Sequence, residues 1–210
     1  MANRRPPIKT GMKVCIVCEG YEEFEYIEKL ISLNVWDDTY NFHPINAESN
    51  GKIPARYQDL YANDIYDIIL IFCDTDQKPF EDYATIKDKI NKIHGVDNSA
   101  ELITVFANPC TMQIILLHFD DIRLTSHKKS DNKSYIKSLT GIGSYQAKKK
   151  QRTRLFSQIT ADNYLLMSTR SKDLSTNDTE ISSSNFNLFI NRFSSTNTIW
   201  ISDINSILES

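Results

Sequence analysis

The sequence predicts an α/β protein with a mainly parallel sheet flanked by helices, followed by a basic, mostly helical C-terminal extension. Apolar runs at 13–18, 67–73 and 102–106 have the length and β-branched content of buried parallel strands. Segments with apolar residues at helical spacing separate these runs, as is typical of βαβ units. Lysine and arginine are then concentrated in the block that follows the last of these strands.

The elements of the first 120 residues are expected to alternate between strand and helix. The first helix begins with three glutamates, which suit the positive end of a helix dipole, and Gly95 ends the third helix. In order, we expect an irregular basic leader ending at Gly11, strand 13–18, helix 21–33, strand 39–47, helix 54–62, strand 67–73, helix 80–93, strand 102–106 and a helix started by Asn108 and Pro109.

The extension is expected to consist of helices joined by polar loops. We predict helices over 134–139 and 145–167, a mobile loop over 168–185 that is rich in Ser, Thr, Asn and Asp, and short helices over 186–193 and 204–208. We therefore divide the chain into an α/β domain over 1–120 and a basic extension over 121–210 packed on the same domain.

Composition excludes several classes of protein. The 210 residues are 40% hydrophobic, which is ample for a core, and contain no apolar run of about 18 residues and no signal peptide, so we expect a cytoplasmic protein outside the membrane. Cys15 and Cys18 have the spacing of a zinc or redox pair, but a strand separates them. We expect these two, Cys73 and Cys110 to be buried thiols.

Charge is distributed unevenly along the chain. Residues 1–120 hold 11 Lys and Arg against 19 Asp and Glu, whereas residues 121–160 hold 10 against 2. A basic strip beside an acidic site suits a protein that handles phosphodiesters, although a charge run can also be a solvated helix face. The residues that we expect to contact nucleic acid are Lys128, Lys129, Lys133, Lys148, Lys149, Lys150, Arg152 and Arg154.

Carboxylates follow two of the predicted strands. Glu19 follows the first strand, and Asp74 and Asp76 follow the strand 67–73. Side chains at i and i+2 share a face of an extended segment, and chemistry gathers at the carboxyl ends of parallel strands. The three carboxylates thus predict a site for Mg²⁺ or Mn²⁺, with the Asp-x-Asp pair as a simple turn being the alternative. Glu23 is either a further metal ligand or a first-turn helix acid.

Several motifs resemble known families. Glu19-Gly20, an acid at Glu23 and the Asp-x-Asp pair look like the Toprim domain of topoisomerases, primases and OLD-family nucleases. Cys-Glu-Gly at 18–20 with Tyr26, Asn-Pro-Cys at 108–110 and Leu-Leu-His-Phe at 116–119 are similar to the RloB-like family. Arg-Arg-Pro-Pro at 4–7 fits the same pattern loosely, so the resemblance covers about residues 1–120.

The resemblance implies a metal-dependent nuclease of bacterial antiviral defence, with Glu19, Asp74 and Asp76 as catalytic residues and Glu23 as a second-metal ligand. RNA, including tRNA, is as plausible a target as DNA. The chain has no P-loop motif, and the resemblance implies a separate ATPase partner of ABC or AAA type. Self-association is left open.

The sequence departs from the family pattern at two points, of which the second favours another class of function. The spacing between Gly20 and Glu23 is one residue shorter than in the family, and Met112 stands where the family carries a glutamate. A catalytically degenerate subunit that binds nucleic acid or a partner is therefore the alternative, and a small-molecule phosphohydrolase is a third. We expect His118 to be a core histidine, and Asn108 to cap the next helix or to bind substrate.

Overall fold

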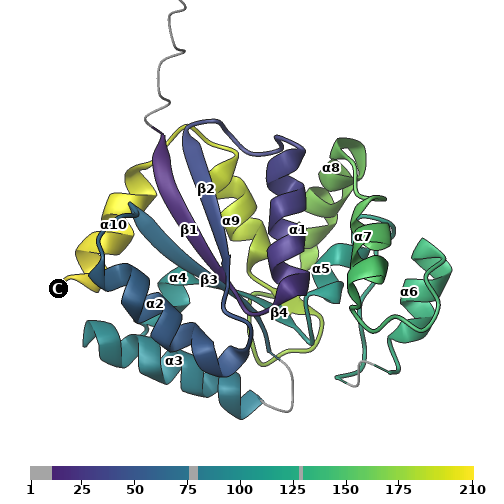
Figure 1. Cartoon of the computed structure of the whole chain (residues 1–210), viewed down its shortest axis with the longest axis horizontal. Coiled ribbons are helices and arrows are strands. Elements are labelled where there is room, and N and C mark those ends of the chain that lie inside the picture. The colour runs from purple at the N-terminus through teal and green to yellow at the C-terminus, as the bar shows by residue number, and fades with distance from the viewer. Residues whose placement is uncertain (1–10, 76–79, 128–129) are drawn as a thin grey trace, which may run out of the picture.

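The computed structural model describes residues 11–75, 80–127 and 130–210. Its sheet has five strands in the order β2-β1-β3-β4-β5, of which the first four are parallel and β5 is antiparallel to β4 (Figure 1). The mixed α/β architecture with a mainly parallel sheet is confirmed. The strands are β1 (Met12–Cys18), β2 (Tyr40–Asn46), β3 (Ile68–Asp74), β4 (Thr104–Asn108) and β5 (Ser183–Ser184).

Helices cover both faces of the sheet. In Figure 1, α2, α3, α4 and α10 lie on one face, and α1 and α9 lie on the other, with α5, α7 and α8 beyond α1. Among the helices described, none combines the length and the apolar character needed to cross a bilayer. The helices are α1 (Tyr21–Ser32), α2 (Ile53–Ala62), α3 (Phe80–His94), α4 (Ser99–Ile103), α5 (Met112–Leu116), α6 (Lys133–Thr140), α7 (Lys149–Phe156), α8 (Ala161–Arg170), α9 (Phe186–Phe193) and α10 (Ile199–Leu208), with short 3₁₀ turns η1 (Asn50–Lys52) and η2 (Ser171–Asp173).

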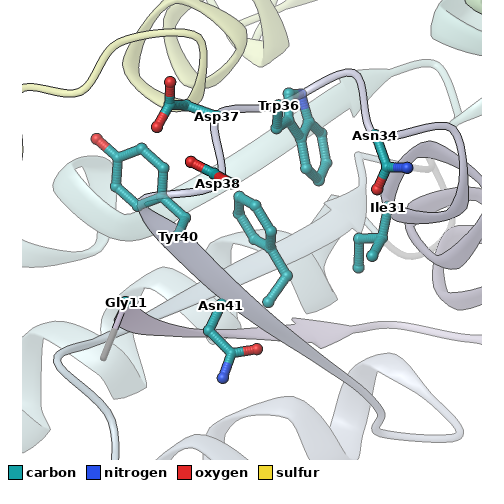
Figure 2. A pocket seen from close by; sticks show the side chains of 9 residues that line it. Gly11, Ile31, Asn34, Trp36, Asp37, Asp38, Tyr40 and Asn41 are labelled. Atoms are coloured by element: carbon teal, nitrogen blue, oxygen red, sulfur yellow. The ribbon is translucent and has the colours of Figure 1, made fainter. Parts of the chain in front are cut away.

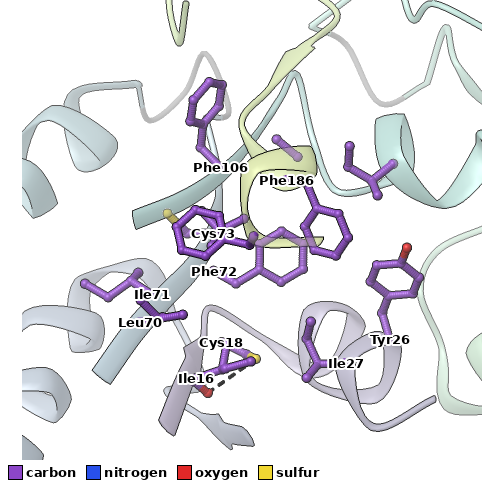
Figure 3. Packing of buried hydrophobic residues seen from close by; sticks show 14 of the residues in the cluster. Ile16, Cys18, Tyr26, Ile27, Leu70, Ile71, Phe72, Cys73, Phe106 and Phe186 are labelled. Atoms are coloured by element: carbon purple, nitrogen blue, oxygen red, sulfur yellow. Dashed lines mark hydrogen bonds between the residues drawn. The ribbon is translucent and has the colours of Figure 1, made fainter. Parts of the chain in front are cut away.

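The core lies between the sheet and the helices on its two faces. Every residue of β3 is buried, as expected of a central parallel strand. Phe72 from β3 packs against Tyr26 of α1 and Phe186 of α9 (Figure 3). Burying each such side chain contributes about 1.5–3 kcal/mol to the stability of the fold, so these contacts hold α1 and α9 on the central strand β3.

Gly11 is the one glycine that a close approach requires at the start of the sheet. A Cβ atom at this position would lie 2.7 Å from the carbonyl oxygen of Thr39. The same carbonyl accepts a hydrogen bond from the N–H of Met12 at 2.8 Å, which starts the pairing of β1 with β2. Any larger residue at position 11 would therefore push these two strands apart.

Several predicted boundaries are wrong, and the last helix, α10, begins at Ile199 rather than at 204. Residues 102 and 103 belong to α4, because Asn91 accepts hydrogen bonds from Ser99 and from the backbone of Ala100 and so holds this short helix. The helix predicted over 145–167 is two helices, since the side chain of Thr160 caps a new helix, α8.

The segment predicted as a loop over 168–185 contains the end of α8, η2 and β5, and its last residues pair with β4 at the edge of the sheet. The hydroxyl of Ser184 donates to Phe106, and the Asn185 side chain accepts from the N–H of Phe106 and donates to the carbonyl of Thr104. These polar side chains replace the hydrogen bonds that a longer strand would make along β4. A composition typical of loops therefore serves here to cover the edge of the sheet.

Candidate metal and nucleic-acid site

Glu19 and Asp74 lie at the point where the strand order reverses. The chain runs from β1 outward to β2 and then returns to β3 on the other side of β1. In open α/β sheets, ligands bind in the crevice at the carboxyl ends of the strands at this switch point. Glu19 follows β1 directly, and its N–H donates to the carbonyl of Phe72 in β3 at 3.0 Å. The topology therefore brings the two predicted carboxylates to one edge.

Both carboxylates are held by hydrogen bonds. The Glu19 Oε2 atom accepts from the backbone N–H of Asp74 at 2.9 Å. The Asp74 Oδ1 atom accepts from both the backbone N–H and the hydroxyl of Thr111, each at 2.6 Å, and the Asp74 residue is only 3% exposed. In the orientation that satisfies both groups, the Asn50 amide nitrogen donates to Glu19 Oε1 at 2.6 Å and Oε2 at 2.7 Å. These bonds fix both side chains before any ligand arrives.

Glu23 is buried at the start of α1, and its carboxylate accepts from the N–H of Gly20 at 3.0 Å. This is the role of a first-turn helix acid. The residue also lies near the other two acids. Burial raises the pKa of the Cys73 thiol well above its ordinary value, and the carboxylates of Glu19, Asp74 and Glu23 raise it further. The three carboxylates therefore all contribute negative charge in the region of this buried thiol.

The donor chemistry at this edge suits a hard cation. Glu19 and Asp74 present oxygen atoms, which Mg²⁺ and Mn²⁺ prefer, and the third predicted ligand, Asp76, lies outside the described residues. Within the part of the chain that the structure describes, no three His, Cys, Asp or Glu side chains are grouped closely enough to hold a metal ion. The metal thus stays a prediction that needs Asp76 or oxygen atoms of other types.

Other oxygen and nitrogen atoms at the same edge lack partners. Thr75 Oγ1, Asn108 Oδ1 and Asn46 Nδ2 are buried and make no hydrogen bond within the described residues. They follow or end β3, β4 and β2, at the carboxyl end of each strand. An unsatisfied buried polar atom costs about 1–3 kcal/mol, so such atoms are usually met by water, an ion or a ligand.

Asn108 does not cap a helix, so that prediction is wrong. The residue ends β4, and its peptide bond to Pro109 is cis. Its side-chain nitrogen donates to the carbonyl of Asp178 at 2.8 Å, while the N-cap of α5 is Thr111. The oxygen of its amide is left at the carboxyl edge, which is consistent with the alternative role in binding.

The basic residues differ in their exposure. Lys148, Lys149 and Lys150 at the start of α7 and Arg154 in its last turn are exposed, and we call these four the basic cluster. Lys133 is half-buried on α6, and Lys128 and Lys129 lie outside the described residues.

Arg152 differs from its neighbours because it is buried. Its guanidinium donates to Glu25 at 2.7 Å and to the carbonyl of Ala147, and it lies over the ring of Tyr21, with 5.2 Å from Cζ to the ring centroid. Arg152 therefore fixes α7 on α1 and is not available to a phosphate. Since the first turn of α1 follows Glu19 directly, this contact places α7, which carries most of the basic cluster, beside α1 at the carboxyl edge of the sheet (Figure 1).

A second contact joins the basic extension to the first turn of α1, beside a small pocket. The Tyr145 hydroxyl donates to Glu22, which neighbours Glu23. Next to it lies a pocket of about 300 Å³, which we call the Tyr145 pocket. Its lining includes Glu22, Met112, Lys133, Ile136, Tyr145 and Gln146.

A larger pocket lies away from the carboxylates. It measures about 740 Å³ and is lined by residues that include Gly11, Trp36, Asp38 and Tyr40 (Figure 2). Gly11 precedes β1 and Tyr40 begins β2, so this pocket lies at the amino ends of the strands. Parallel strands place the two ends on opposite edges, and the volume alone therefore does not identify the site.

The four cysteines and His118 are core residues, as predicted. All four thiols are buried and none forms a disulfide, and burial raises the pKa of Cys15 to about 12. His118 is 1% exposed and hydrogen-bonds to the Tyr26 hydroxyl at 2.9 Å and to Asn163 at 3.1 Å. These groups therefore pack and hydrogen-bond within the core.

Two site residues escape prediction from the sequence. Thr111 follows Asn-Pro-Cys, but nothing in the sequence says that it would hold Asp74, 37 positions earlier. Asn50 lies in η1, far from any recognised motif, and reaches Glu19 only because β2 returns to the same edge. Comparisons with protein-family models, with curated proteins and with solved structures find no match for this chain.

Proposed function

We propose that this protein is a nuclease that depends on Mg²⁺ or Mn²⁺. The observation that carries the proposal is the meeting of Glu19 and Asp74 at the switch point of the sheet, beside an anchored cluster of exposed lysines. An acidic metal site engages one phosphate while basic residues neutralise its neighbours. The acids and the basic cluster are far apart in the sequence but are brought together by the fold, which supports a role for both in binding one substrate.

Glu19, Asp74 and Asp76 would hold the metal, and Glu23 is a candidate for a second ion. When bound, a divalent ion supplies Lewis-acid stabilisation of the scissile phosphate and lowers the pKa of a bound water. The chain's own part is positioning. Thr111 fixes Asp74 with two hydrogen bonds, and the N–H of Asp74 fixes Glu19. Such supporting hydrogen bonds typically change metal affinity by 10- to 100-fold.

The basic cluster would contact the backbone of the substrate. Its lysines are exposed and carry no ion pair with another described residue. Contacts with phosphates give affinity without sequence preference, so RNA, including tRNA, and DNA both suit this surface.

The biological role within this proposal rests on the resemblance to the Toprim and RloB-like families. It comprises antiviral defence in the bacterial cytoplasm, by abortive infection or restriction, and control by a separate ATPase of ABC or AAA type. The described part of the chain adds that no helix could span a membrane.

A second candidate is a catalytically degenerate subunit that binds nucleic acid or a partner. Met112 favours it, since this residue lines the Tyr145 pocket at the start of α5 and cannot bind magnesium. The hydrogen bonds from Asn50 to both oxygens of Glu19 also favour it, because a metal ligand would have to release or reorient that amide.

A cleavage assay separates the two candidates. Purified protein is incubated with Mg²⁺ or Mn²⁺ and a mixed pool of tRNA and plasmid, beside Glu19→Gln and the matched control Asp59→Asn, an exposed acid of α2. Glu19→Gln keeps an oxygen that can accept from the N–H of Asp74 but loses the charge. Cleavage that is lost only in Glu19→Gln supports the nuclease, and binding of the pool without cleavage by any protein supports the degenerate subunit.

A further inference from the structure

The Tyr145 pocket has walls suited to a flat, partly polar ring. Met112, Ile136 and Tyr145 are buried and supply apolar surface. The Tyr145 ring is held in place because its hydroxyl donates to Glu22. A volume of about 300 Å³ lies at the small end of ligand sites, which suits one compact ring system and its attached sugar.

Polar groups stand at the rim of this apolar surface. Gln146 is exposed, and its carboxamide makes no hydrogen bond with another described residue. The Glu22 carboxylate also lines the pocket and can accept from an exocyclic amine. Amide and carboxylate groups of this kind pair with the hydrogen-bonding edges of nucleobases, so this rim suits a nucleobase better than a purely apolar ligand.

Positive charge lies where the phosphates of such a ligand would run. Lys133 lines the pocket, is half-buried and forms no ion pair within the described residues. The basic cluster begins two residues after Gln146, at Lys148. A strand whose base entered the pocket would thus place its backbone along lysines on both sides.

The pocket also adjoins the carboxylate edge through the chain itself. Glu22 is next in sequence to Glu23, and Met112 is next to Thr111, which holds Asp74. A base in the pocket would therefore belong to a nucleotide close to the phosphate at the switch point.

We propose that the Tyr145 pocket binds one unpaired nucleobase of a single-stranded nucleic acid and so sets the position of cleavage. This inference rests on the proposed nuclease function, which it extends from the backbone of the substrate to one of its bases. Enzymes that act on nucleic acid hold extruded bases in this way, by stacking on aromatic or apolar side chains and by hydrogen bonds to the base edge.

The test measures binding without cleavage. The full chain, with EDTA present, is titrated with short single-stranded oligonucleotides of DNA and of RNA that carry one central 2-aminopurine, and with the same strands carrying an abasic site instead. Two variants perturb the pocket: Met112→Trp fills it, and Gln146→Ala removes a rim amide from an exposed position that does not affect folding. Lys149→Ala with Lys150→Ala is the matched control for backbone contacts.

We expect 2-aminopurine fluorescence to be quenched on binding to the wild type. Met112→Trp should lower the affinity for the base-containing strand by about tenfold and leave the affinity for the abasic strand unchanged. Gln146→Ala should change the ratio of affinities among bases by about tenfold. The lysine control should lower the affinity for both strands by the same factor. If Met112→Trp fails to fold, Gln146→Ala alone decides.

Equal affinity of wild type and both pocket variants for the base-containing strand, with no quenching, would overturn the inference even if cleavage occurs. Base-dependent binding without metal-dependent cleavage would support the inference and overturn the nuclease. If AMP displaces the oligonucleotide at a concentration equal to that of the oligonucleotide, the pocket binds a free nucleotide, and the inference is overturned.

Discussion

His118 is expected to make the stability of this protein depend on pH. Its Nδ1 donates to the Asn163 oxygen, because that oxygen also accepts from Thr160 while the Asn163 nitrogen donates to Gln158. The Nε2 atom then accepts from the Tyr26 hydroxyl. A second proton on the ring would place a charge in the core, and burial accordingly lowers the pKa of His118 from 6.5 to about 4.

The magnitude follows from linkage between protonation and folding. The unfolded chain binds a proton at this residue below about pH 6.5, whereas the folded chain does so only below about pH 4. Stability is therefore unaffected above this window and falls as the pH drops through it, by about 1.4 kcal/mol per pH unit. The loss between about pH 7 and about pH 5 is about 2 kcal/mol, and the full loss is about 3 kcal/mol.

Urea unfolding of the wild type and of His118→Gln at these two pH values measures this effect. The difference between the two proteins isolates His118, since the other titrating groups are common to both. We expect the wild type to lose about 2 kcal/mol more than the variant. Parallel pH dependence in the two proteins, or an NMR titration of His118 near its ordinary pKa, would refute the reasoning.

Three further changes test the packing of the site and of the sheet. Arg152→Ala should destabilise the fold by about 2 kcal/mol, because it leaves Glu25 without its partner in a partly buried pair; urea unfolding measures this, and an unchanged midpoint would contradict it. Thr111→Val should cost about 2 kcal/mol and weaken Mn²⁺ binding about tenfold, because Asp74 loses a hydroxyl donor; calorimetry with an unchanged affinity would count against that role. Gly11→Ala should cost about 2 kcal/mol in thermal unfolding, since its Cβ would lie 2.7 Å from a carbonyl oxygen, and a variant as stable as wild type would disprove the close approach.

The parallel core was predictable because its signals are local. The apolar run that became β3 and the helical periodicity that became α3 each lie within one segment, and both elements are present. The sheet edge formed by residues 183–185 was not predictable in the same way. Ser184 and Asn185 have the composition of a loop, and only the position of β4 beside them turns their side chains into partners of the sheet edge.

The site was predictable in part for the same reason. Strand ends in a parallel sheet share an edge, so the sequence alone brings Glu19 and Asp74 together. Their partners come from distant segments whose positions depend on the whole fold, as Thr111 and Asn50 do. Charge counting likewise places Arg152 in the basic strip but cannot tell that it is buried against Glu25.

Binding of Mn²⁺ followed by electron paramagnetic resonance tests the central claim most directly, since it depends on neither the substrate nor a partner. The wild type and Asp59→Asn should bind the ion alike, and Glu19→Gln should bind it at least about tenfold more weakly. Mn²⁺ at about 100 times its dissociation constant should also raise the free energy of unfolding of the wild type by about 2.7 kcal/mol. Equal binding by all three proteins, or by none, would contradict a metal site built on Glu19 and Asp74.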